Sequence, residues 1–197
     1  EVAKRERMTR EIEIAREAVA QVLVPRSRAG GGADVQVLHL DPEGFVMPPM
    51  DPRQRATPGG LVDDSLPELT GLKLAVLQSG RRVDSAAVVA GLRLISEFAC
   101  SPMAGLVDLR RIDVSAPDVL VVTTAQGSEV TFALQDLDRQ LRRWREIHDQ
   151  IQRKPGRIVS LDLAVPSNSP LRWLEASALP TVPPKPPKPL RSKKNHV

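Results

Sequence analysis

Residues 118–173 predict a hairpin, an amphipathic helix and a further strand in succession, and this order constrains the fold more than any other part of the chain. Two runs rich in β-branched residues, 119–124 and 129–134, flank a four-residue linker at 125–128. Gly127 in that linker supplies the positive φ angle that a tight turn needs. The pattern therefore predicts two antiparallel strands.

The helix of this unit is expected over residues 136–152, where apolar side chains recur at spacings of three to four residues and arginines occupy the other faces. Lys-Pro-Gly at 154–156 ends it. Residues 157–163 predict the next strand, and the Ser/Asn/Pro cluster at 166–170 predicts a turn or bulge before Leu171 and Trp173. The unit carries no catalytic pattern and ends in a strand with room to pair outward, as expected of a docking module. The apolar stripe consists of Leu137, Leu141, Trp144, Ile147 or His148, and Ile151.

Composition limits the class of protein. The 197 residues are enough for one domain or two small ones, and a hydrophobic content of 41% is enough for a core. Aromatic residues make up only 3%, with no tyrosine, so the core is expected to be aliphatic. No run approaches the roughly 20 apolar residues that span a bilayer. The first residues, Glu-Val-Ala, are neither a signal peptide nor an initiating Met, so we expect the natural N-terminus to lie elsewhere.

Positive charge is concentrated at the C-terminus. The chain has a net charge of +4, and the five basic residues after Leu179, with no acid among them, leave a charge of about −1 for the rest (+4 − 5). Proline is frequent between Pro180 and Pro189, so this tail is expected to be extended, polyproline-like and disordered. A solvated terminus or contact with an anionic surface explains it, whereas the absence of interleaved aromatics argues against nucleic acid. The basic residues are Lys185, Lys188, Arg191, Lys193 and Lys194.

The first half of the chain predicts several short strands and one helix. Asp84 is the candidate N-cap of the helix, and residues 48–65, rich in Pro and Gly, are expected to form an irregular surface crossing. With the unit at 118–173, this order predicts an α+β fold with two helices packed on a mainly antiparallel sheet. The strands are expected at 10–15, 18–24, 34–40, 45–47 and 107–115, and the helix at 84–99.

Residues with catalytic or metal-binding chemistry are few. The three histidines, His39, His148 and His196, do not stand at metal-binding spacing with another ligand. Cys100 is the single cysteine, which excludes an intramolecular disulfide, and it is expected to be a small buried residue. Asp63-Asp64 and the glycines at 30–32 are interpreted as loop residues, with an enzyme that uses Asp63-Asp64 as a remote alternative. The sequence therefore predicts no enzyme, metal, cofactor or small-molecule substrate.

Four segments, in order, resemble the FtsQ/DivIB family of bacterial cell division proteins. Residues 12–20 resemble the closing strands of its POTRA domain, and Leu-Asp-Pro-Glu-Gly-Phe-Val at 40–46 is similar to its Asp-x-x-Gly turn. Leu-Pro-Glu-Leu-Thr-Gly at 66–71 is similar to its Leu-Pro-x-Leu-x-Gly motif, and residues 157–173 resemble its final strand and turn. Together the segments cover residues 1 to about 175.

The resemblance implies a bitopic protein of the bacterial inner membrane, with this region on the periplasmic or extracytoplasmic side. Residues 1–24 would be the C-terminal part of a POTRA domain, 25–176 the β domain and 177–197 the tail. A transmembrane helix would precede the sequence. Such proteins are non-enzymatic divisome scaffolds in septum formation, and they bind the FtsB and FtsL pair by β-strand addition. A basic-tailed module that binds an anionic polymer or membrane surface through residues 185–194 is the alternative.

Carried over by position, the resemblance implies a partner-binding edge in the last part of the unit. Where other members have Arg-Tyr after Asp-Leu, this chain has Ala164-Val165, so apolar packing and backbone pairing are expected to provide the contact. Ala133 replaces a common glycine and Ala18 a common proline. Trp173 is equally compatible with a core position and with the interface. The expected partner-binding residues are Leu163, Ala164, Val165, Ser167, Ser169, Leu171 and Trp173.

Overall fold

The computed structural model describes residues 18–27, 33–47, 65–151, 156–165 and 169–175. Its helices are the 3₁₀ turn η2 (Leu74–Val76), α2 (Ala86–Ala99) and α3 (Leu137–Ile151). Its strands are β1 (Ala20–Ser27), β2 (Ala33–Leu40), β3 (Val46–Met47), β4 (Glu68–Thr70), β5 (Leu109–Asp113), β6 (Val119–Thr124), β7 (Glu129–Ala133), β8 (Gly156–Asp162) and β9 (Leu171–Glu175).

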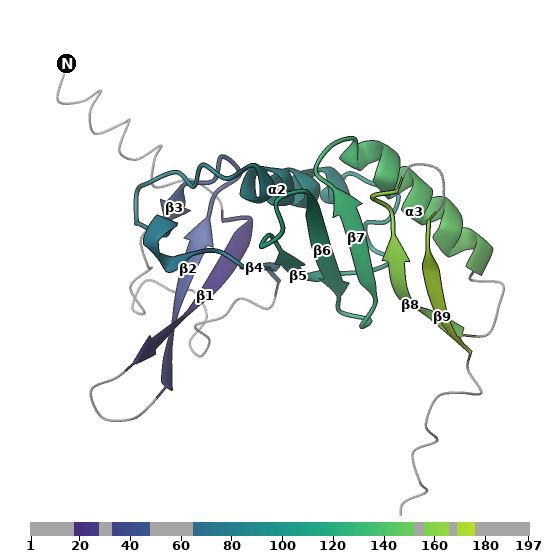
Figure 1. The fold of residues 1–197 in the computed structure, drawn as a ribbon, viewed down its shortest axis with the longest axis horizontal. Coiled ribbons are helices and arrows are strands. Elements are labelled where there is room, and N and C mark those ends of the chain that lie inside the picture. The colour runs from purple at the N-terminus through teal and green to yellow at the C-terminus, as the bar shows by residue number, and fades with distance from the viewer. Residues whose placement is uncertain (1–17, 28–32, 48–64, 152–155, 166–168, 176–197) are drawn as a thin grey trace, which may run out of the picture.

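The strands form one nine-stranded sheet in the order β3-β2-β1-β4-β5-β6-β7-β8-β9. Most neighbours are antiparallel, whereas β1 with β4, β4 with β5, and β7 with β8 are parallel. The α2 helix lies in the connection from β4 to β5 and α3 in that from β7 to β8, and Figure 1 shows both helices over one face of the sheet. The predicted α+β fold with two packed helices is confirmed.

The strongest hydrophobic patterns correspond to the observed elements. The predicted hairpin is β6 and β7, and its register pairs Val122 with Val130 and Leu120 with Phe132. Alternate residues of β6 are buried, as the period of two requires. The predicted helices at 84–99 and 136–152 differ from α2 and α3 by one or two residues at their ends. Helix ends are defined less sharply than helix interiors, so differences of this size are ordinary.

The core lies between the helices and the sheet face that they cover. Trp144 of α3 is 2% exposed and contacts Phe132 of β7, with ring centroids 5.8 Å apart in an edge-to-face arrangement. Phe98 of α2 meets the same indole at 6.1 Å, so one tryptophan joins both helices to the sheet. Most other buried side chains are Val, Leu, Ile and Ala, as the low aromatic content predicts.

Two sequence predictions about single residues are wrong. The N-cap of α2 is Ser85 rather than Asp84, and Ser85 makes no side-chain capping hydrogen bond. Cys100 is exposed rather than buried. It follows directly after α2 at the C-cap position, where the chain leaves the helix.

Two strands were not predicted. β4 has only three residues and lies within the Leu-Pro-Glu-Leu-Thr-Gly motif, which gives no alternation long enough to recognise. β9 follows the Pro-containing cluster at 166–170, which is predicted as a turn or bulge, and Leu171 and Trp173 are expected there as partner-binding residues without a strand of their own. Residues 25–27 extend β1 beyond the strand predicted at 18–24, because β2 pairs with it from Ala20 to Ser27.

Several expectations fall outside the described residues. These are the strand at 10–15, the glycines at 30–32, most of the crossing at 48–65, and the tail at 177–197. The expected domain boundary after residue 24 lies inside β1, which belongs to the same sheet as all later strands. In the described part of the chain, no helix is long and apolar enough to cross a membrane.

Candidate docking edge

The two outer strands of the sheet differ in how their free sides are covered. On the outer side of β3, the N–H of Val46 donates to the carbonyl of Arg81 at 2.9 Å, and the carbonyl of Val46 accepts from Gly80 at 2.7 Å. Phe45 forms an isolated antiparallel bridge with Arg82 on the same side. The segment after η2 therefore closes the β3 edge with backbone hydrogen bonds.

The opposite end of the sheet is open within the described residues. There β9 pairs antiparallel with β8, and no strand follows β9 in the sheet order. The N–H of Asp162 donates to the carbonyl of Pro170 at 2.9 Å, which directs the backbone of residue 170, and by alternation that of Arg172, toward β8. The N–H and C=O groups of Leu171 and Trp173 consequently point to the open side, where they form a template for another strand.

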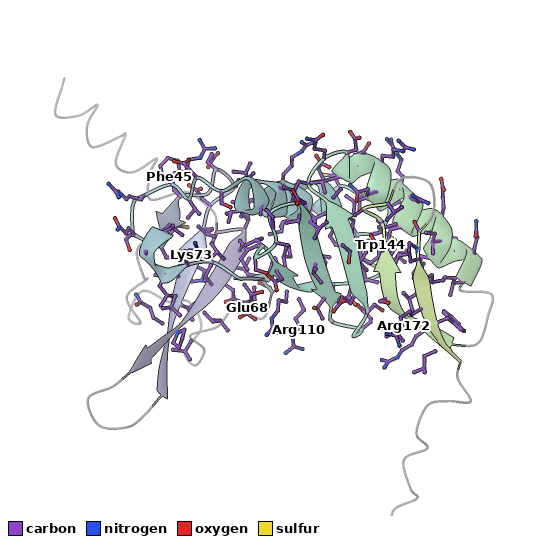
Figure 2. The ribbon with its side chains drawn as sticks, viewed as in Figure 1. Phe45, Glu68, Lys73, Arg110, Trp144 and Arg172 are labelled. Carbon is purple, nitrogen blue, oxygen red and sulfur yellow. The ribbon has the colours of Figure 1, made fainter. Side chains whose placement is uncertain are left out.

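The side chains of β9 alternate between two faces. Leu171 is cross-strand from the buried Leu161, and Trp173 from the buried Ile158, so both lie on the face that the helices cover. Leu171 is 39% exposed, which is high for a leucine in a sheet. Arg172, cross-strand from Ser160, projects from the helix-free face, as Figure 2 shows.

The turn between β8 and β9 is held from two directions. A side-chain oxygen of Asp162 accepts from the N–H of Ala164 at 2.9 Å, and the N–H of Leu163 donates to the carbonyl of Thr131 in β7 at 2.8 Å. Arg143 of α3 donates to the carbonyl of Val165 at 2.9 Å. These contacts fix the point from which the chain enters β9.

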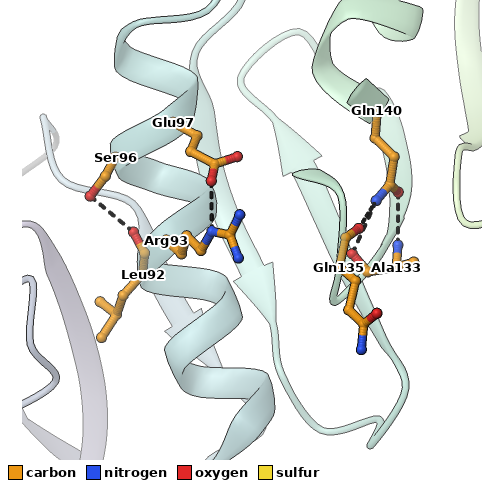
Figure 3. Close-up of polar contacts among 7 residues, drawn as sticks. All are labelled: Leu92, Arg93, Ser96, Glu97, Ala133, Gln135 and Gln140. Carbon is orange, nitrogen blue, oxygen red and sulfur yellow. Dashed lines mark hydrogen bonds and ion pairs between the residues drawn. The ribbon is translucent and has the colours of Figure 1, made fainter. Parts of the chain in front are cut away.

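Gln140 of α3 forms hydrogen bonds with the backbone of β7 beyond the last residue of β7 that pairs with β8. Its carboxamide oxygen accepts from the N–H of Ala133 at 2.9 Å, and its amide nitrogen donates to the carbonyls of Ala133 at 3.3 Å and Gln135 at 2.6 Å (Figure 3). Gln140 is 7% exposed. A side-chain amide thus takes the place of a strand neighbour, which ends the β7–β8 pairing and lets the chain turn toward β9.

α3 also contacts the loop after α2. Arg145 donates to the carbonyl of Pro102 and to the carboxylate of Asp149, at 2.9 Å and 2.8 Å. The hydrogen bond from Arg145 lowers the pKa of Asp149, while desolvation acts in the opposite direction. The helix that holds the docking edge is therefore fixed to α2 as well as to the sheet.

Trp173 packs against a glycine at the start of β8. Gly156 has a φ angle of +144°, and a Cβ atom there would lie 2.4 Å from the Trp173 ring and 2.4 Å from the carbonyl of Leu174. Beside this contact is a pocket of about 240 Å³ under the C-terminal turn of α3, lined by Trp144, His148 and Trp173 among others. Only glycine fits at 156 without moving β9.

The structure separates the predicted partner-binding residues into three groups. Leu163 is buried directly after β8, whereas Ala164, the 40% exposed Val165 and Ser169 lie between β8 and β9. Ser167 lies outside the described residues. Leu171 and Trp173 lie on the open strand itself, and Trp173 is half-buried against the core.

Sequence reasoning missed four residues that shape this edge. Arg172 and Leu174 were passed over because β9 was not recognised as a strand, although its first three residues, Leu-Arg-Trp, do alternate between apolar and polar. Gln140 stands on the buried stripe of α3 between Leu137 and Leu141, and a polar residue in that place could have indicated a buried hydrogen-bonding role. Gly156 was interpreted only as a helix stop.

The other residues considered in the sequence do not form a metal-binding site within the described ranges. In the ranges that the structure describes, no group of three His, Cys, Asp or Glu residues could hold a metal ion. His39 lies in β2 and His148 in α3, and they do not converge with other ligands into such a group. Asp63-Asp64, His196 and the basic residues at 185–194 fall outside those ranges.

Comparison with known proteins finds no protein-family model that matches this chain and no curated protein with significant similarity to it.

Proposed function

We propose that this chain is a non-enzymatic docking module that binds a partner by adding its strand to β9. The observation that carries the proposal is the difference between the two sheet edges: backbone hydrogen bonds cover β3, whereas β9 presents the peptide groups of Leu171 and Trp173. An added strand gains main-chain hydrogen bonds there, and its alternate side chains meet two different faces. The position of β9 is determined by α3 and the turn before it.

The biological role that we propose is that of a scaffold in bacterial cell division. The resemblance of four ordered segments to the FtsQ/DivIB family supports this role, and that family recruits the FtsB and FtsL pair by strand addition. On this proposal the partners are FtsB- and FtsL-type divisome proteins, and the region acts on the extracytoplasmic side of the inner membrane. Neither nucleic acid nor a small-molecule substrate takes part.

A Leu171→Pro substitution tests the docking edge. Proline removes the outward N–H of residue 171 but no hydrogen bond to β8, so we expect partner affinity to fall at least about tenfold. The free energy of unfolding should fall by no more than about 1 kcal/mol, because proline is tolerated on edge strands. Titration calorimetry with a purified FtsB/FtsL-type pair measures the affinity, and urea unfolding measures the stability.

Leu171→Val is the matched control, since it keeps the N–H and an apolar side chain and should bind nearly as the parent does. Equal affinity of the proline and valine variants would exclude pairing at this edge. The parent and a chain that ends at residue 176 should also bind alike. If binding disappears with the tail, the alternative module that contacts an anionic surface through residues 185–194 is supported instead.

A further inference from the structure

The two faces of β9 offer a partner strand different chemistry. On the helix side, Leu171 and Trp173 form an apolar row that continues the core, and the exposed Val165 lies in the turn beside it. Arg172 lies on the helix-free side. The next residue of β9 on that face is Leu174, and Leu174 is cross-strand from Arg157 of β8. The edge is therefore apolar on one side and basic on the other.

The basic side has no acidic partner within the described residues. Ion pairs elsewhere on the molecule involve other arginines, such as Arg111 with Glu68 at 3.0 Å and Arg93 with Glu97 at 2.6 Å. Arg172 and Arg157 form none within the described ranges, and both are exposed. A strand added to β9 would place one side chain directly opposite Arg172, with the Cβ atoms about 5 Å apart.

We propose that β9 selects strands in which apolar and acidic residues alternate. Apolar side chains would lie opposite Leu171 and Trp173, and an Asp or Glu would lie opposite Arg172. This inference rests on the proposed function, because it assigns a chemistry to the strand that docks there. The period of two also fixes the register, since a shift by one residue would place the acid against the apolar row.

Three synthetic peptides with central sequences Val-Glu-Val, Val-Lys-Val and Glu-Val-Glu test the selectivity. Each carries N-methyl groups along one edge, so that it can pair with β9 but not with further copies of itself. Competition against a labelled Val-Glu-Val peptide, followed by fluorescence anisotropy, gives the relative affinities. We expect Val-Glu-Val to bind about fivefold more tightly than Val-Lys-Val, because opposite charges stabilise and like charges destabilise a cross-strand pair.

Arg172→Glu should invert the order of Val-Glu-Val and Val-Lys-Val. The matched control is Arg110→Glu, an exposed arginine of β5 far from β9, which should leave the order unchanged (Figure 2). Equal affinities of all three peptides for the parent chain, or an order that Arg172→Glu does not change, would overturn the selectivity and leave the docking edge standing. No binding by any of the peptides would contradict the docking edge itself.

Discussion

Gly156→Ala is expected to separate β9 from β8 at its C-terminal end and to move Trp173. The new Cβ would lie 2.4 Å from both the indole ring and the carbonyl of Leu174, and neither side can give way without a shift of the strand. The positive φ angle of +144° adds strain for any residue with a side chain. Overpacking and backbone strain together should lower the free energy of unfolding by about 3 kcal/mol.

Urea unfolding measures that loss, and tryptophan fluorescence reports the movement of the ring. Trp144 is 2% exposed but lines the same pocket as Gly156 and Trp173, so the fluorescence is compared in a Trp144→Phe background, where a red shift arises from Trp173. Gly105→Ala is the matched control, because Gly105 also has a positive φ angle, +78°, but no atom lies within 4 Å of its added Cβ. It should cost about 1 kcal/mol and leave the fluorescence unchanged. Equal losses in the two variants would show that the contact with Trp173 is unimportant.

Gln140→Leu should destabilise the chain by a similar amount through lost hydrogen bonds. The leucine keeps the approximate volume but leaves the N–H and C=O of Ala133, and the carbonyl of Gln135, without their partner on α3. Each buried polar group left without a hydrogen bond costs about 1–3 kcal/mol, so a total of about 3 kcal/mol is expected. Hydrogen exchange should increase most at the amide of Ala133, which distinguishes this local opening from a general loss of packing.

Two further variants make the test of Gln140 specific. Gln150→Leu changes an exposed glutamine of the same helix and should alter stability by less than about 0.5 kcal/mol. Gln140→Glu keeps the acceptor for Ala133, but its ionised form cannot donate to the two carbonyls. Because the protonated form can donate, folding should raise the pKa of the new carboxyl group, and stability should recover as the pH falls. A pH-independent loss would contradict the role of the amide as donor.

The sequence predicted those elements whose side-chain period is long and regular. The alternation in β6 and β7, and the apolar stripes of α2 and α3, each extend over several repeats, so local pattern and tertiary packing agree. The short strands were missed for the opposite reason. β4 is a strand because it pairs with β1 and β5 on its two sides. Its three residues are too few to show an alternation from which a strand could be predicted.

The candidate site was predicted only in part. Leu171 and Trp173 were expected at the partner edge and lie on β9, whereas Leu163 is 2% exposed in the core. The positions that support the edge could not be identified from the sequence, because their importance depends on long-range contacts. Gln140 is important because it accepts a hydrogen bond from the backbone N–H of Ala133 in β7. Gly156 is important because it leaves room for the Trp173 ring, seventeen positions later in the chain.

The pairing between β1 and β4 determines how the sheet would respond to a pulling force, if the chain is held before β1 and its partner pulls at β9. The two strands are paired at a single residue pair, Gln21 with Glu68. The backbone N–H of Gln21 donates to the carbonyl of Pro67 at 3.0 Å, and its side-chain amide donates to the carbonyl of Leu66 at 2.9 Å. A pulling force applied at β9 and resisted before β1 would cross the sheet perpendicular to its strands. The tension would then be concentrated at this narrow joint, so rupture should begin there and leave the hairpin of β6 and β7 intact.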